Sequence, residues 1–94
     1  MGEIRTVSVV IEGRVQGVSY RAWTQTEARA RGLSGSVRNR KDGTVEAVFS
    51  GAPEIVAEML TLCRSGPPAA RVTDITVREQ DGPPAHQGFQ ILHG

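Results

Sequence analysis

The sequence has one cysteine, few aromatic residues and no long apolar run, and each shortage excludes a class of protein. Cys63 stands alone among 94 residues, so no internal disulfide can form and we expect a reducing, cytoplasmic compartment. Aromatic residues make up only 4% of the chain, which argues against a sheet that stacks nucleic-acid bases. No stretch approaches the ~20 apolar residues that cross a bilayer, and the N-terminus lacks a signal-peptide pattern. We therefore expect neither a nucleic-acid nor a membrane partner.

An excess of one charge is also lacking. The chain has 11 Lys and Arg against 10 Asp and Glu, for a formal net charge of +1, so any anion-binding site must be local. Its two histidines, His86 and His93, have no cysteine or acidic partner at the spacing of metal ligands. We expect no metal and no cofactor. The length predicts one small domain, residues 1–94, with a single core, and we expect it to be a monomer.

What the sequence does contain is strand and helix patterns in the order β-α-β-β-α-β. Period-2 alternation predicts strands over 4–12 and 34–40, a strand after the Lys41-Asp42-Gly43 turn, and a strand over 72–79 with a bulge or frayed start. Helices are predicted over 21–31 and from Pro53 to the Gly66-Pro67-Pro68 stop. Their expected core-facing residues are Trp23, Thr26, Ala30 and Leu33 in the first region and Ile55, Met59, Leu62 and Cys63 in the second. The tail 89–92 could add a short edge strand.

This order matches the ferredoxin-like pattern. It predicts an α+β fold: a four-stranded antiparallel sheet in the order 4-1-3-2, with both helices on one face. In this topology the strands over 4–12 and 34–40 run the same way, on either side of a third strand. Their C-terminal ends therefore emerge at one edge, and Asn39 is expected ~10 Å from the loop after the first strand.

The most informative stretch is 12–21, in which a strand-like run stops at Gly13 and a helix-like run begins at Arg21. Glycines at 13 and 17 let the backbone curl and aim successive N–H groups at one point before the helix, which attracts phosphate. Arg21 in the first helical turn opposes the helix dipole unless an anion lies between them. On spacing alone, a tight connection without a ligand is the commoner interpretation, since neither Gly-x-Gly-x-x-Gly nor a P-loop is present.

With Arg21 and Asn39 both in view, the chain resembles the acylphosphatase family over nearly its whole length. The family's first motif is matched by Ile11-Glu12-Gly13-Arg14-Val15-Gln16-Gly17-Val18-Ser19-Tyr20-Arg21, and its second by Gly35-Ser36-Val37-Arg38-Asn39 with Gly43, Val45 and Gly51. Two positions depart from the family pattern. Tyr20 stands where Phe or Met is more common, but its ring is of similar size, so this difference does not weaken the resemblance. Ser36 stands where an aromatic residue is usual, which could loosen the fit of the substrate.

The resemblance implies hydrolysis of the anhydride between a carboxylate and phosphate, without a metal. It implies that the Arg21 guanidinium binds the phosphate of a small acyl phosphate substrate and that Asn39 orients the attacking water. The rest of the phosphate site would be the backbone N–H groups of Val15, Gln16, Gly17, Val18, Ser19 and Tyr20. No strong base is required, because an acyl phosphate already carries a good leaving group.

Two other function classes were weighed beside this one. A non-catalytic acylphosphatase-like module that binds a phosphorylated compound is not distinguished by sequence. An RNA-binding domain with the same element order is disfavoured, because the Arg/Lys-Gly-aromatic-Gly-aromatic run is absent. Ser19 has no His-Asp pair, Cys63 suits a small hydrophobe, and Arg38 and Arg40 suit a solvated strand face. No residue selects among possible acyl phosphates.

Overall fold

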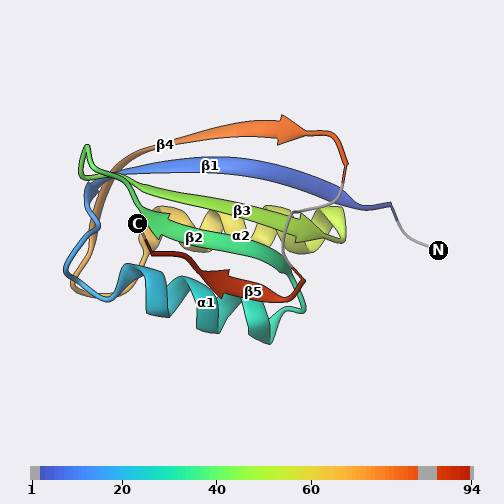
Figure 1. Ribbon diagram of the computed structural model, residues 1–94, viewed down its shortest axis with the longest axis horizontal. Helices are drawn as coiled ribbons and strands as arrows, with labels where there is room; N and C mark the ends of the chain where they lie inside the picture. Colours follow the sequence, from blue (N-terminus) through green and yellow to red (C-terminus); the bar gives the residue numbers. More distant parts are fainter. Residues whose placement is uncertain (1–2, 83–86, 94) are drawn as a thin grey trace.

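The computed structural model describes residues 3–82 and 87–93 (Figure 1). The elements in chain order are β1 Arg5–Arg14, α1 Tyr20–Ala30, β2 Ser34–Asn39, β3 Val45–Gly51, α2 Pro53–Ser65, β4 Arg71–Gln80 and β5 Phe89–Ile91. The predicted β-α-β-β-α-β order is confirmed. In the part of the chain that is described, neither helix is long and apolar enough to cross a bilayer.

The strands form one sheet in the order β4-β1-β3-β2-β5. The predicted order 4-1-3-2 of the first four strands and their antiparallel pairing are confirmed. The expectation of a purely antiparallel, four-stranded sheet is wrong, because β5 pairs in parallel with β2 and makes the sheet five-stranded and mixed. Burial of Phe89 holds this short strand, since its ring stacks on Phe49 with centroids 5.5 Å apart.

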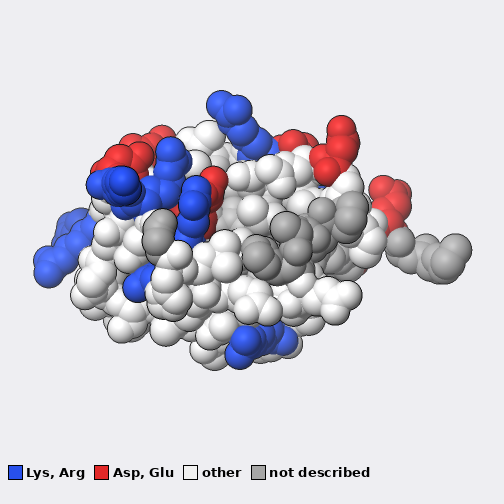
Figure 2. All heavy atoms as spheres, in the orientation of Figure 1, with Lys and Arg blue, Asp and Glu red and all other residues white. Residues whose placement is uncertain are grey.

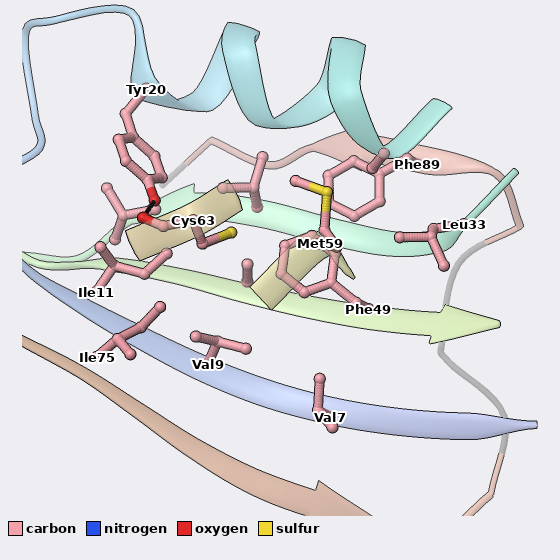
Figure 3. Close-up of a cluster of buried hydrophobic side chains, with 14 of the residues drawn as sticks. Val7, Val9, Ile11, Tyr20, Leu33, Phe49, Met59, Cys63, Ile75 and Phe89 are labelled. Atoms are coloured by element: carbon pink, nitrogen blue, oxygen red, sulfur yellow. Dashed lines mark hydrogen bonds between the residues drawn. The ribbon is translucent and has the colours of Figure 1, made fainter. Parts of the chain in front are cut away.

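Both helices pack on one face of the sheet, as predicted, and a single hydrophobic core lies between them and the strands (Figure 3). The sheet contributes fully buried side chains from β1, β2 and β3, with Ile75 of β4 and Phe89 of β5 beside them: Val7, Val9, Ile11, Val37, Val45, Ala47 and Phe49. Alternation along β1 and β3 therefore identifies the correct core face of these two strands.

The core-facing side of α1 differs from the prediction. Tyr20, Thr24 and Ala28 are buried, whereas Ala30 is exposed and Trp23 is only half-buried. Hydropathy alone missed this face because Thr24 is polar, yet its hydroxyl donates to the Tyr20 carbonyl at 2.8 Å and is thereby satisfied inside the core. The α2 prediction is partly right: Met59 and Cys63 are buried together with Val56, while Ile55 and Leu62 lie half-buried at the margin.

Strand β1 does not stop at Gly13 but continues to Arg14. The predicted bulge at the start of the fourth strand is confirmed, since Glu12 pairs with Asp74 whereas Gly13 pairs with Val72. Gly13 has a φ of +123°, and a Cβ there would collide with the backbone of β4. Gly13 therefore allows the close pairing of β1 with β4 rather than forming part of the anion loop itself.

Candidate active site

The loop after β1 and the end of β2 meet at one edge of the sheet, because β1 and β2 run in the same direction on either side of β3 (Figure 1). Two adjoining pockets lie there, of about 250 Å³ and about 610 Å³. Arg21, Asn39 and His93 line both of them. The structure therefore brings together the two residues that sequence reasoning paired, and adds a histidine.

The loop before α1 has an unusual backbone conformation and a run of N–H groups without acceptors among the described residues. Gly17 has a φ of +75°, and Ser19, the N-cap of α1, has a left-handed φ of +63° and makes no side-chain capping bond. The first helical bond of α1 runs from Trp23 N–H to the Ser19 carbonyl. Among the described residues, no acceptor is found for the N–H groups from Gln16 to Ala22. A run of such donors at a helix N-terminus suits an anion.

The first end of the loop is held in place by a buried side chain and by side-chain hydrogen bonds. Val15 is 1% exposed and anchors the first end in the core. The Gln16 amide donates to the carbonyl oxygens of Arg40 and Thr44, each at 2.8 Å. This side chain ties the loop to the β2–β3 hairpin, so the spacing between the loop and Asn39 is fixed by direct bonds.

Tyr20 fixes the start of α1 from the other side. Its ring is buried, and its hydroxyl donates to the Cys63 carbonyl near the end of α2 at 2.6 Å (Figure 3). Desolvation by burial is the main cause that raises the pKa of Tyr20, so the phenol stays protonated and remains a donor. Burial likewise raises the pKa of the Cys63 thiol to about 12, which fits the small hydrophobe that the sequence predicts.

Arg21 lies in the first turn of α1, a turn that contains no acidic residue. Among the described residues, no carboxylate forms an ion pair with it. Its guanidinium therefore adds an unpaired positive charge to the positive end of the helix dipole, which is unfavourable in the absence of an anion.

Asn39 contains a buried hydrogen-bond acceptor that is not satisfied within the described residues. Its side-chain carbonyl oxygen Oδ1 is buried and has no hydrogen-bond partner among the described residues, and no other buried side-chain oxygen or nitrogen described shares that state. A buried acceptor left unpaired costs ~1–3 kcal/mol. Asn39 is also a residue that lines both pockets, and a buried polar atom without a partner is uncommon in a folded protein.

The remaining predicted site residues divide into two groups. Val15, Gly17, Ser19, Tyr20 and Arg21 line the smaller pocket. Gln16 and Val18 do not, and Gln16 acts through its side chain on the hairpin. Ser36 lines neither pocket.

Sequence reasoning considered His93 only as a metal ligand. Parallel pairing of β5 with β2 places it at the site: the Leu92 N–H donates to the Val37 carbonyl at 2.9 Å, and His93 follows. No group of three potential metal-ligating His, Cys, Asp or Glu side chains occurs within residues 3–82 and 87–93. His86, the other histidine considered, lies outside the described residues.

Comparison with known proteins gives one consistent result. The acylphosphatase family model matches residues 7–91. An acylphosphatase of Azorhizobium caulinodans is 58% identical over 86 residues, covering 92% of each chain. One of Bradyrhizobium diazoefficiens is 60% identical over 70 residues, covering 74% of this chain and 71% of the relative. The crystal structure of acylphosphatase from Bacillus subtilis superposes with a TM-score of 0.89 at 36% identity, over 96% of this chain and 99% of that one.

Proposed function

This chain belongs to the acylphosphatase family and is a hydrolase acting on acyl phosphates, and we propose that Arg21 and Asn39 are the residues that carry its chemistry. The reaction splits the carboxyl–phosphate bond with water and yields a carboxylate and inorganic phosphate. The proposal assigns the phosphate to the smaller pocket and the attacking water to Asn39.

The phosphoryl group is held by the loop and by Arg21. Backbone N–H groups of residues 15–20 donate to its oxygens, and the planar guanidinium takes two oxygens at once, which a lysine cannot do. Support comes from the run of N–H groups without acceptors and from the cation placed in the first turn of α1. In the transition state the same donors stabilise the negative charge that spreads over the phosphoryl oxygens.

The water is oriented by Asn39. Its Oδ1 accepts one proton of the water and directs the lone pair at phosphorus, opposite the leaving carboxylate. The phosphoryl group itself takes up the water's proton, so no side chain with a raised pKa is required. The single observation that favours hydrolysis over phosphate binding alone is the unpartnered Oδ1 of Asn39, a residue that lines both pockets.

Two broader properties belong to the proposal as well. We propose a monomer, because Ile4 is the one large hydrophobic residue among those described that is exposed, and an isolated apolar side chain needs no partner. We propose the cytoplasm as its compartment, on the strength of the single, buried Cys63.

The test is release of inorganic phosphate from benzoyl phosphate with a metal chelator present, for wild type, Arg21→Ala and Arg78→Ala. Arg78 is an exposed cation of β4 that lines neither pocket. We expect hydrolysis by wild type and Arg78→Ala and its loss in Arg21→Ala. Phosphate binding without any hydrolysis by wild type would make the protein a binding module. Full activity of Arg21→Ala would show that the site is misplaced.

A further inference from the structure

The larger pocket concentrates positive charge beside the proposed phosphate site. Four cationic side chains line it: Arg21, Arg38, Arg40 and Lys41. The whole chain has 11 cationic and 10 acidic residues, yet Asp42 is the only acidic residue among the described ones that lines this pocket. Figure 2 shows Lys and Arg side chains gathered toward the left end of the molecule, where Figure 1 places the β2–β3 hairpin. The larger pocket therefore has a local excess of positive charge, although the protein as a whole is nearly neutral.

Beside Arg21, the cations of this set that are least engaged by other described residues are Arg40 and Lys41. Arg38 donates to Glu46 at 2.7 Å and is engaged. Asp42 accepts from the Thr44 hydroxyl and N–H, and these bonds lower its pKa. Arg40 forms a long ion pair with Asp42 at 3.9 Å, without a hydrogen bond between them. Among the described residues, no carboxylate pairs with Lys41.

The two pockets share Arg21, Asn39 and His93, so they adjoin each other at these residues. If the smaller pocket holds the phosphoryl group, the larger one is where the acyl group extends from it. Its lining is polar and cationic, with Leu92 as its one apolar side chain among the described residues. Such a lining favours an anionic group over a purely apolar one.

We propose that Arg40 and Lys41 form a subsite for a second anionic group on the substrate, so that the enzyme prefers acyl phosphates whose acyl part carries a carboxylate or phosphate. This inference rests on the proposed function. It assigns specificity, not chemistry, to the hairpin: the bond that breaks is the same for every acyl phosphate, and the hairpin cations contact only the far end of the acyl group.

The experiment compares benzoyl phosphate with 4-carboxybenzoyl phosphate, which differ by one carboxylate on the same ring. For each, kcat/KM is measured in wild type, Arg40→Gln, Lys41→Gln and the matched control Arg78→Gln, which also removes one positive charge. We expect wild type to prefer the carboxylated substrate. Each hairpin substitution should lower that preference about two- to fivefold, the size of one exposed charge pair, whereas Arg78→Gln should leave it unchanged. The preference should also shrink as ionic strength rises.

Binding of benzylphosphonate and 4-carboxybenzylphosphonate, measured by calorimetry, tests the subsite independently of turnover. A ratio of dissociation constants that favours the carboxylated phosphonate and falls in Lys41→Gln supports the subsite even if no substrate is hydrolysed. Absence of hydrolysis would then count only against the proposed function. Equal affinity for both phosphonates, or a preference that Arg78→Gln lowers as much as Lys41→Gln does, would overturn the subsite.

Discussion

At its C-terminus helix α1 follows the local rules for ending a helix, whereas at its N-terminus it breaks them. The C-terminal end has Gly32 in the left-handed region, and the N–H groups of Gly32 and Leu33 donate to the carbonyls of Arg29 and Ala28, a Schellman arrangement. Arg31 adds ion pairs to Glu27 and to Glu58 of α2. Backbone groups are satisfied there within the protein.

The N-terminal end has a non-glycine N-cap in the left-handed region, no capping bond, no acid and a cation in the first turn. A left-handed residue costs ~1–2 kcal/mol, and a cation at this end is unfavourable by ~0.3–1 kcal/mol. The C-terminal end of α1 is thus stabilised by local interactions, whereas the N-terminal end is destabilised by its own. This contrast supports the proposed anion site at the N-terminal end, since local rules tend to be broken where function requires it.

The sharpest test of this contrast is to remove an arginine from each end. Arg21→Ala should lower kcat/KM for an acyl phosphate about a thousandfold, or ~4 kcal/mol, through both kcat and KM, because in its proposed role Arg21 contacts the phosphoryl group in ground and transition states. It should also raise the free energy of unfolding by ~0.3–1 kcal/mol without ligand. Arg21→Lys should recover little activity. Steady-state kinetics and urea denaturation measure both effects.

The matched control is Arg29→Ala in the last turn, where the cation suits the helix dipole and donates to the Phe89 carbonyl at 3.2 Å. This variant should lose stability and keep its kcat/KM within a few-fold. If Arg21→Ala proved as destabilising as Arg29→Ala, the strain assigned to the N-terminal end would be absent.

Asn39→Ala extends the comparison to β2 by removing the buried, unpaired acceptor. We expect kcat to fall about a hundredfold, or ~2.7 kcal/mol, while the inhibition constant of inorganic phosphate stays nearly constant, because Asn39 acts on the water. Kinetics with phosphate as competitive inhibitor measure both. A parallel loss of phosphate affinity would make Asn39 an anion-binding residue instead.

Gly17→Ala and Gly32→Ala form a matched pair at the two ends. Their φ values are +75° and +70°, and nothing lies within 4 Å of a Cβ built at either position. Each substitution should cost ~1–2 kcal/mol of stability through the backbone alone. Gly17→Ala should in addition lower kcat/KM about tenfold, because a changed backbone conformation would reorient the loop N–H groups that are proposed to bind the phosphoryl group. Equal activity of the two variants would argue against a role for the loop backbone.

The smallest expected effects are on stability, from substitutions of the side chains that anchor the two ends of α1. Tyr20→Phe removes the hydroxyl that bonds the Cys63 carbonyl and should cost ~1–2 kcal/mol, because a buried acceptor is left unpaired. Arg31→Gln removes two ion pairs of a half-buried arginine at the protein surface and should cost ~1 kcal/mol or less. Urea denaturation compares them. A larger cost for Arg31→Gln would mean that the C-terminal end depends on tertiary contacts more than the N-terminal one.

The element order, the sheet order of the first four strands and the meeting of Asn39 with the loop before α1 could all be predicted from the sequence. Alternation fixes which face of each strand is buried, and the β-α-β-β-α-β order then leaves few ways to arrange the strands. Arg21 and Asn39 could be paired because two strands that run the same way end at the same edge. These are consequences of local pattern and connectivity.

Other features of the fold and site could not be predicted from the sequence, because they depend on contacts between distant elements. The buried face of α1 depends on a bond from Thr24 to a backbone carbonyl, which hydropathy does not register. The bond of Tyr20 to α2 and the bonds of Gln16 to the hairpin join residues far apart in the chain. His93 reaches the site because Phe89 is buried and β5 pairs with β2. Such contacts depend on the exact approach of distant elements, which packing sets and no local pattern encodes.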